Sequence, residues 1–291
     1  MPIEWYPGHM ATAYKYAAET MRTTDVVIEV LDARVPASSC NPQVEALRRE
    51  NQRPALKLLN KVDVADPLRT TQWLQHYNAI PGVTAVALSA LNKGDVRRIP
   101  EACLALAPNR GTHAKPLRMM ILGIPNVGKS TLMNTLLKRH VANVGDEPAI
   151  TRMQMRHELG PGMWIVDTPG MLWPGLGQEV ALKLAATHSI GRNAYNDEDV
   201  AADLGTYLQA EYPSALTRRF GGIPSGSDGM ALLACVAKAR SLVAKGGAPD
   251  LLKAAQALLN DFRAGTLGRI TLETVEQVAA RPPPPAKKSR R

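Results

Sequence analysis

The chain has 291 residues, 45% of them hydrophobic, and a formal net charge of +9. This length allows one large domain or two ordinary ones, each able to bury a core. No apolar run reaches the roughly 18 residues of a membrane span, and the first residues lack the layout of a secretion signal. The three cysteines are scattered outside any CxxC pair, which argues against a disulfide scaffold or a zinc site and favours a reducing cytoplasm.

The positive charge is concentrated at the C-terminus. The last eleven residues, RPPPPAKKSRR, hold five Lys or Arg and no acid, which leaves +4 for the rest of the chain. The net charge is compatible with a nucleic-acid-binding protein and equally with a mildly basic soluble protein that carries a basic tail. The proline run predicts an extended segment, and we expect a disordered tail after it.

Helical and strand-like patterns alternate through the first 175 residues. The strand-like runs are mostly apolar, and the first of them, at 25–36, is also rich in β-branched residues, which is typical of a buried strand. This alternation predicts an α/β fold in which a mostly parallel sheet carries helices on both faces. In chain order, we expect a helix at 10–22, a strand at 25–36, a helix at 41–51, a strand at 54–63, a helix at 66–79, a strand at 83–90, a helix at 94–108, a strand at 117–124, a helix at 129–140 and a hairpin at 154–170.

Two of these helices begin with the same signal. Asn41 precedes Pro42, and Asp66 precedes Pro67. An Asn or Asp side chain can accept hydrogen bonds from the first N–H groups of a helix, and proline is favoured at the first helical position. We therefore expect both side chains to be N-caps.

The pattern changes near Leu176. Amphipathic segments with helical spacing follow one another at 178–190, 197–212, 229–245 and 249–265, without strand-like runs between them. They predict a second, all-helical domain. The expected division is a sheet-containing domain at 1–175, a helical RNA- or ribosome-binding domain at 176–280 and a disordered basic tail at 281–291.

The stretch GIPNVGKST at 123–131 has the pattern of a phosphate-binding loop between a strand and a helix. Gly123 and Gly128 allow backbone N–H groups to turn inward around a β-phosphate, and the helix N-terminus favours the negative charge. Lys129 reaches the β- and γ-phosphates, and Ser130 offers a hydroxyl to Mg²⁺. The chain is therefore predicted to bind a nucleoside triphosphate.

Two further elements follow the phosphate loop. DTPG at 167–170 comes after an apolar strand, so Asp167 can hold Mg²⁺ and the Gly170 N–H can meet the γ-phosphate. Thr151, in PAITR, can close on Mg²⁺ and the γ-phosphate when GTP is bound and release them afterwards. These positions correspond to the two switch regions of a nucleotide-dependent switch.

The tetrad NKVD at 60–63 comes before the phosphate loop. Asp63 offers two acceptors to the guanine N1–H and exocyclic amine, Asn60 can donate to the other edge of the base, and the stem of Lys61 can pack on the base. Adenine presents the wrong donors to this set. In the stretch SAL, which is Ser89, Ala90 and Leu91, the Ala90 N–H can meet guanine O6.

All five elements of a GTP-binding domain are thus present, in a rotated order. Together with WYPGHM, LDARVP, DTPGMLWP and DFRAGTLGRITLE, they make the sequence resemble the circularly permuted GTPases of the YlqF/RbgA type, the ribosome biogenesis GTPase A family. The resemblance covers nearly the whole chain. It implies a P-loop GTPase domain with a circularly permuted motif order and an all-α C-terminal domain that contacts ribosomal RNA.

The resemblance also bears on hydrolysis. Ras-like GTPases use a glutamine directly after DxxG to orient water, but Met171 stands there, and the resemblance implies that a hydrophobic residue is usual in the family. It also implies that His9 lies near the switches, where it either holds the water or only pins the N-terminal segment. Similar GTPases that have an asparagine in the phosphate-binding loop, where this sequence has Asn126, bind K⁺ beside the phosphates.

The function implied by these features is that of a GTP-hydrolysing assembly factor that acts late on the large (50S) ribosomal subunit and is stimulated by the ribosome. The alternatives are an RNA-binding assembly protein with GTP as a structural ligand, and a GTPase with another RNA partner. We expect a cytoplasmic monomer with GTP or GDP, Mg²⁺ and K⁺, and without a membrane or DNA partner. The expected catalytic residues are His9, Lys129, Thr151 and Gly170. The residues expected to bind the nucleotide are Asn60, Lys61, Asp63, Ser89, Ala90, Leu91, Asn126, Val127, Gly128, Lys129, Ser130, Thr131, Thr151 and Gly170. The expected metal ligands are Ser130, Thr151 and Asp167 for Mg²⁺ and Asn126 for K⁺.

Overall fold

A computed structural model describes residues 9–138, 155–224 and 226–280 of the chain. Two predicted site residues fall outside this description: Thr151 entirely, and His9 except for its backbone, which begins the first helix. None of the helices in the described ranges is long and apolar enough to cross a membrane.

The described residues form a six-stranded sheet in the order β3-β2-β1-β4-β6-β5. Five strands run parallel, and β5 pairs antiparallel with β6. The predicted α/β fold is thus confirmed, including the hairpin at Gly160–Gly162. The strands are β1 (Val26–Asp32), β2 (Ala55–Asn60), β3 (Val83–Ala87), β4 (Leu117–Leu122), β5 (Met155–Gly160) and β6 (Met163–Asp167).

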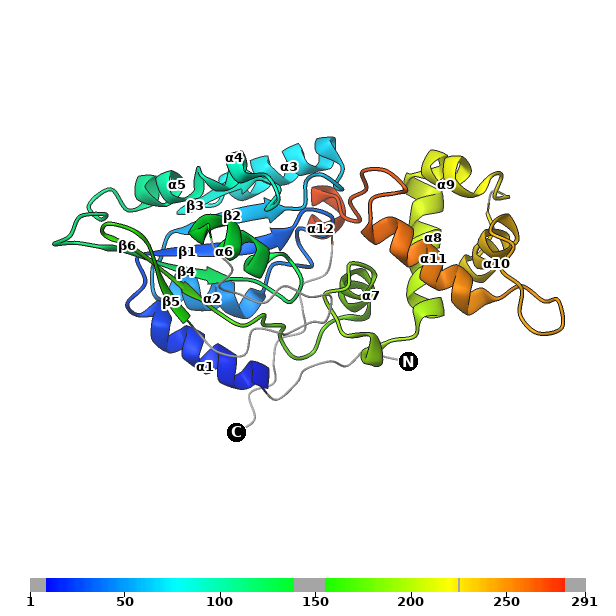
Figure 1. Cartoon of the computed structure of the whole chain (residues 1–291), viewed down its shortest axis with the longest axis horizontal. Helices are drawn as coiled ribbons and strands as arrows, with labels where there is room; N and C mark the ends of the chain where they lie inside the picture. Colours follow the sequence, from blue (N-terminus) through cyan, green and yellow to red (C-terminus); the bar gives the residue numbers. More distant parts are fainter. Residues whose placement is uncertain (1–8, 139–154, 225, 281–291) are drawn as a thin grey trace.

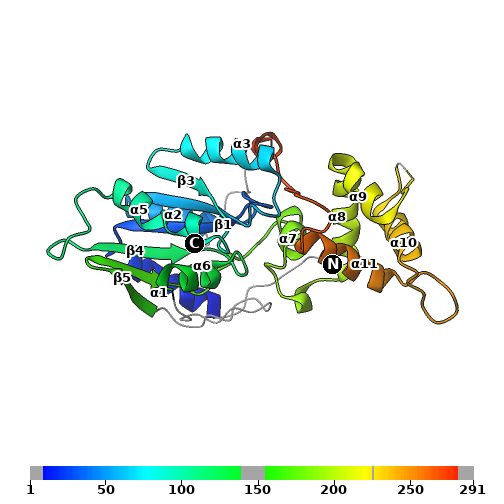
Figure 2. The same ribbon diagram turned by 45° about the horizontal axis from the view of Figure 1, so that its top comes forward.

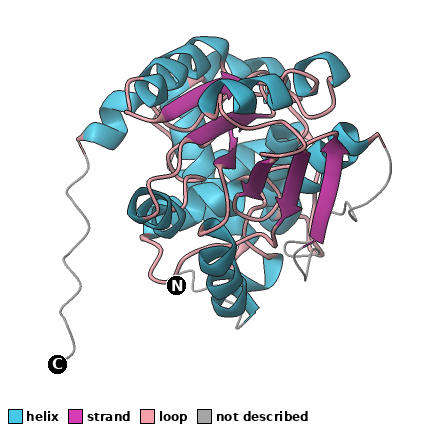
Figure 3. Ribbon diagram, turned by 90° about the vertical axis from the view of Figure 1, so that its left-hand side faces the viewer, coloured by secondary structure: helices cyan, strands magenta, loops and turns pink. Residues whose placement is uncertain are grey.

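Helices cover both faces of the sheet (Figure 3). One face packs against α1 (His9–Met21), α2 (Pro42–Glu50) and α3 (Pro67–Asn78), and the other against α4 (Lys93–Val96), α5 (Ile99–Leu106) and α6 (Lys129–Leu137). Asn41 and Asp66 cap α2 and α3 as predicted, each accepting from two backbone N–H groups.

The single helix predicted at 94–108 is wrong, because α4 and α5 divide it at Arg97–Arg98. Pro100 lies in the first turn of α5. It has no N–H to donate to the carbonyl four residues earlier, and its ring clashes with that turn, so proline is tolerated only at the start of a helix.

The C-terminal part of the chain is helical, and its α8, α9, α10 and α11 lie beyond the end of the sheet on the right of Figure 1. The sequence pattern predicts neither the second of these helices nor the last helix in the described part of the chain. The elements are α7 (Gln178–Ala186), a 3₁₀ turn η1 (Arg192–Ala194), α8 (Asp197–Glu211), α9 (Pro213–Phe220), α10 (Gly229–Ala239), α11 (Leu251–Arg263) and α12 (Val275–Ala279).

After α11 the chain returns to the sheet-containing part, where α12 packs beside α3 (Figures 1 and 2). The buried Glu273 carboxylate accepts hydrogen bonds from the Ala37 N–H at 2.8 Å and the Ser38 N–H at 3.0 Å, and its backbone carbonyl accepts from Trp73 Nε1 at 3.1 Å. A buried carboxylate needs such partners. This segment of the predicted helical domain therefore anchors the helices beside the carboxyl ends of the strands.

Candidate nucleotide-binding site

The predicted phosphate-binding loop connects β4 to α6. Gly123 has φ +153°, and a Cβ there would lie 2.6 Å from the Val30 carbonyl oxygen; Gly128 has φ +100°, and its Cβ would lie 2.3 Å from Asn60 Nδ2. Both glycines are therefore required by the backbone and by close packing. Ser130 and Thr131 follow Lys129 in the first turn of α6, whose N-terminus opens on the loop.

Lys129 is folded back on this loop. Its ammonium donates to the carbonyls of Gly123 at 3.0 Å and Ile124 at 2.8 Å, and the residue is 7% exposed. Burial lowers the pKa of Lys129 to about 8, against the opposing attraction of the Asp167 carboxylate. An ammonium whose charge is this costly to bury is suited to neutralise an incoming phosphate.

Asp167 ends β6 beside this lysine. The residue is 3% exposed, and its Oδ1 is buried without a hydrogen-bond partner among the described residues. Burial raises the pKa of Asp167, while the nearby Lys129 opposes that rise. An orphaned carboxylate oxygen fits a hard cation. The described residues contain no group of three His, Cys, Asp or Glu that could hold a metal alone, so the donor set fits Mg²⁺ shared with phosphates and water rather than a protein cage.

The DTPG turn packs directly on the phosphate loop. Thr168 donates its hydroxyl to the Ile121 carbonyl at 2.7 Å, and the Met171 N–H donates to the Gly123 carbonyl at 3.2 Å. A Cβ on Gly170 would lie 2.9 Å from Cα of Pro125. Only glycine therefore allows this turn to approach the loop so closely.

The two base-reading motifs meet at Asn60. Its Nδ2 donates to the Val127 carbonyl at 2.7 Å, and its Oδ1 accepts from the Ala90 N–H at 2.8 Å. The Ala90 N–H expected to meet guanine O6 thus contacts Asn60, whose amide has a second N–H for a ligand. Ser89 lies beside Ala90 and donates its N–H to Asp95 at 3.3 Å, whereas Leu91 and Asp63 are exposed.

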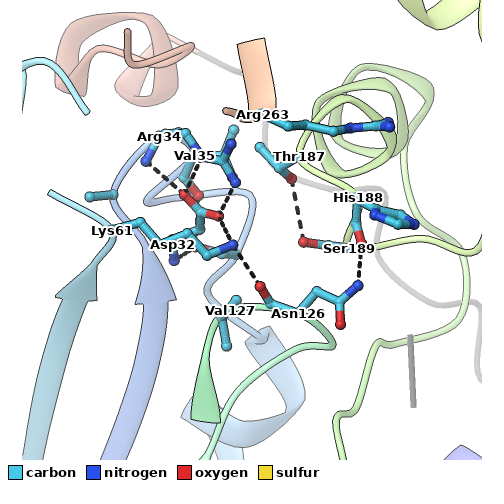
Figure 4. A network of polar contacts seen from close by, with 12 residues as sticks. Asp32, Arg34, Val35, Lys61, Asn126, Val127, Thr187, His188, Ser189 and Arg263 are labelled. Carbon is cyan, nitrogen blue, oxygen red and sulfur yellow. Dashed lines mark hydrogen bonds and ion pairs between the residues drawn. The ribbon is translucent and has the colours of Figure 1, made fainter. Parts of the chain in front are cut away.

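Lys61 connects the base-reading tetrad to the phosphate loop (Figure 4). Its ammonium donates to the Asn126 carbonyl at 2.6 Å and to Asp32 Oδ2 at 2.9 Å. Asp32, at the end of β1, also accepts from the Arg34 guanidinium at 2.9 and 2.7 Å. The charges of Arg34 and Lys61 hold the pKa of Asp32 well below its usual range, although burial opposes them. Asp32 and Arg34 lie in the LDARVP stretch that carries the family resemblance, but the sequence pattern predicts no role for either residue.

The phosphate loop also contacts the helical part of the chain. Asn126, with φ +58°, donates its Nδ2 to the His188 carbonyl, 2.8 Å away in the turn after α7. Figure 4 shows the side-chain oxygen of Asn126 on the side away from His188. The Arg34 guanidinium lies 5.3 Å from the ring centre of Phe262 in α11. Two residues of the site therefore reach into the helices.

Met171 occupies the position of the Ras-like glutamine, yet its side chain is 2% exposed and belongs to the hydrophobic cluster that contains Val44 and Leu122. We expect Met171→Gln to lower the free energy of unfolding by about 1–3 kcal/mol, because it buries an amide among apolar groups. We also expect no increase in kcat. Urea unfolding and GTP turnover test this, with Met155→Gln on β5 as the control at a 53% exposed methionine. A more active Met171→Gln protein would show that the side chain can leave the core.

The lowered pKa of Lys129 makes nucleotide binding depend on pH. A polyphosphate beside the ammonium raises that pKa. Near pH 7 the lysine is already charged, but above pH 8 binding must take up a proton, so we expect the Kd for GTP to rise by up to about tenfold per pH unit between pH 8 and 9. Calorimetry at pH 8.5 in buffers of different ionisation enthalpy measures the proton. Equal heats in all buffers would contradict the prediction.

The site thus unites the predicted phosphate-binding loop, the DxxG turn and the NKVD tetrad at the carboxyl ends of the parallel strands, with the tetrad first in the chain. These features define a P-loop GTP-binding protein with circularly permuted motifs. A family model described as "50S ribosome-binding GTPase" matches residues 118–204, which begin at β4 and leave the tetrad on the N-terminal side.

Relatives match along nearly the whole chain. The ribosome biogenesis GTPase A of Bacillus cereus is 36% identical over 285 residues, covering 95% of this chain and 95% of that protein. Mitochondrial ribosome-associated GTPase 1 of Bos taurus is 31% identical, covering 92% of this chain and 88% of that protein. The solved structure of GNP-bound YlqF from T. maritima has a TM-score of 0.62 at 26% identity and covers 90% of this chain and 98% of that one. The chain belongs to the ribosome biogenesis GTPase A family and is a GTPase, as the sequence motifs predicted.

Proposed function

We propose that the chain is an assembly factor that binds the large (50S) ribosomal subunit late in its maturation and hydrolyses GTP faster when bound there. The observation that carries the proposal is the similarity over 95% of the chain to a protein named for ribosome biogenesis. The description of the matching family as ribosome-binding supports the large subunit. The protein acts as a monomer in the cytoplasm, and its helical part contacts ribosomal RNA.

In this proposal the phosphate loop binds the triphosphate. The N–H groups of Gly128, Lys129, Ser130 and Thr131 face the phosphates, and the Lys129 ammonium exchanges the loop carbonyls for phosphate oxygens. The Ser130 hydroxyl and the Asp167 carboxylate would hold Mg²⁺, which would supply neutralisation of the phosphate charge. Thr151 completes this shell, and the Gly170 N–H donates to the γ-phosphate.

The base is read at the other end of the site. Asp63 accepts from the guanine N1–H and amine, and Asn60 donates its second N–H to the opposite edge. Lys61 lies over the base while Asp32 and the Asn126 carbonyl hold its ammonium in place. Ala90, with Ser89 and Leu91, closes the loop around the base. Val127 contributes the carbonyl that fixes Asn60.

Hydrolysis needs a group other than residue 171 to position water, because Met171 is buried. We assign this role to His9, and the neutralisation of developing charge to K⁺ bound by the Asn126 side-chain oxygen. The bond from Asn126 Nδ2 to the His188 carbonyl supports this assignment, since it turns the oxygen of the same amide away from the helices. Faster turnover in KCl than in NaCl at equal ionic strength is expected, and equal rates would remove K⁺ from the proposal.

The decisive experiment is co-sedimentation with purified large and small subunits under a GTP analogue, GDP and no nucleotide, at one stated salt concentration, because phosphate contacts make RNA binding strongly salt-dependent. Single-turnover GTP hydrolysis is measured with the same subunits. We expect nucleotide-dependent binding and faster hydrolysis with large subunits alone. Binding without stimulation would favour a passive RNA-binding protein with structural GTP. Binding to neither subunit would favour another RNA partner.

A further inference from the structure

Asn41 joins the start of α2 to the segment that follows DTPG. The residue is 1% exposed. Its Oδ1 accepts from the N–H groups of Gln43 at 2.9 Å and Val44 at 3.4 Å, and its Nδ2 donates to the Met171 carbonyl at 2.9 Å. One buried amide therefore caps a helix and binds the backbone of the second switch at the same time.

The orientation of this amide is fixed by its neighbours. Two helix N–H groups face one end and can only be met by an acceptor, and the Met171 carbonyl faces the other end and can only be met by a donor. The backbone N–H of Asn41 donates to the buried Glu29 carboxylate at 3.2 Å, which holds the residue from behind. Only an amide with this orientation satisfies both sides.

Met171, whose carbonyl is bound by Asn41, directly follows Gly170, the residue proposed to donate its N–H to the γ-phosphate. The N–H of Met171 is bound to the Gly123 carbonyl, its carbonyl is bound to Asn41, and its side chain is buried. On the other side Gly170 packs against Pro125 of the phosphate loop. The N–H and the carbonyl of Met171, in the peptide units on either side of its Cα, are thus both held, and Gly170 immediately precedes them.

We infer that Asn41 is a positioning residue for γ-phosphate recognition: it preorganises the Gly170 N–H through the Met171 carbonyl. The inference rests on the proposed role of Gly170. It predicts an effect on nucleotides that carry a γ-phosphate and little effect on GDP, because GDP lacks the γ-phosphate that the Gly170 N–H is proposed to meet. A residue that only capped α2 would affect both nucleotides alike, through the stability of the fold.

Two variants separate the two ends of the amide, and a third at another helix cap is their control. Asn41→Ser retains a good N-cap acceptor but loses the donor that reaches Met171. Asn41→Ala loses both. Asn196→Ser is the control for a changed cap alone, because Asn196 is an exposed residue that caps α8 with the same pair of acceptor bonds, at 2.7 and 3.4 Å.

Affinities for a fluorescent non-hydrolysable GTP analogue and for fluorescent GDP are measured for each protein, with thermal unfolding as a check of the fold. We expect Asn41→Ser and Asn41→Ala to bind the analogue about five- to tenfold more weakly, the effect of one hydrogen bond, and GDP within about twofold of wild type. Asn196→Ser should match wild type for both ligands. Should Asn41→Ser not fold, Asn41→Thr, which also offers an N-cap acceptor but no amide donor, carries the same expectation.

Wild-type affinities from Asn41→Ser, or equal losses for the analogue and GDP, would overturn the inference. Failure of the underlying role is recognised separately with Gly170→Ala, whose methyl group meets Pro125. If Gly170→Ala binds the analogue as tightly as wild type does, then the DTPG turn does not recognise the γ-phosphate, whatever Asn41 holds.

Discussion

Replacing Asp63 by asparagine is expected to lower the affinity for GTP by about 10²- to 10⁴-fold, because a site built to pair with a base strongly rejects a mismatched partner. The carboxylate offers acceptors to the two guanine N–H groups. An asparagine replaces one of the two acceptor oxygens with an NH₂ group. That group is a hydrogen-bond donor and faces the guanine amine, which is also a donor. Xanthine carries a carbonyl in place of that amine, so we expect xanthosine triphosphate to bind the variant better than GTP.

The fold should tolerate this change, since Asp63 is exposed. Asp199→Asn, at an exposed position of α8, controls for the loss of one surface charge. Equilibrium binding of both triphosphates to wild type, Asp63→Asn and Asp199→Asn measures the switch in preference. An Asp63→Asn protein that still prefers GTP would mean that the tetrad does not read the base.

The parts of the fold that follow from local chemistry could be predicted from the sequence. The caps at Asn41 and Asp66 depend on an acceptor and a proline within two positions, and both are confirmed. The buried strands β1 and β2 depend on mostly apolar runs, in which Glu29 and Lys57 are buried as an ion pair. The break before Pro100 follows from an equally local rule, that proline is tolerated only at the start of a helix. The prediction of one helix at 94–108 instead followed the helical pattern of the residues on both sides.

The contacts that assemble the site could not be predicted in the same way. Asn126 and His188 are 62 positions apart, and Asn41 and Met171 are 130 apart, so no sequence pattern connects them. Met171 illustrates the limit well. Its chemistry showed that it cannot orient water, but only the packing shows that its side chain lies in the core and that its backbone is held from both sides.

Lys129 is expected to matter most for the reaction. We predict that Lys129→Met lowers kcat for GTP hydrolysis by about 10²- to 10³-fold or more, the usual effect of removing one group that stabilises charge in the transition state. Single-turnover hydrolysis at saturating GTP measures it. Lys138→Met, an exposed lysine at the end of the same helix, is the matched control and should retain wild-type activity.

The same variant should keep its ligand-free stability. Burial lowers the pKa of Lys129, which means that the fold disfavours the ammonium, and methionine replaces it with an apolar chain of similar length. The Gly123 carbonyl retains the Met171 N–H as a donor. A melting temperature near that of wild type, together with lost hydrolysis, would show that this lysine serves the reaction and not the stability of the fold. A large loss of stability would instead make the lysine a structural clamp of the loop, and the loss of activity could then be assigned to the misplaced backbone.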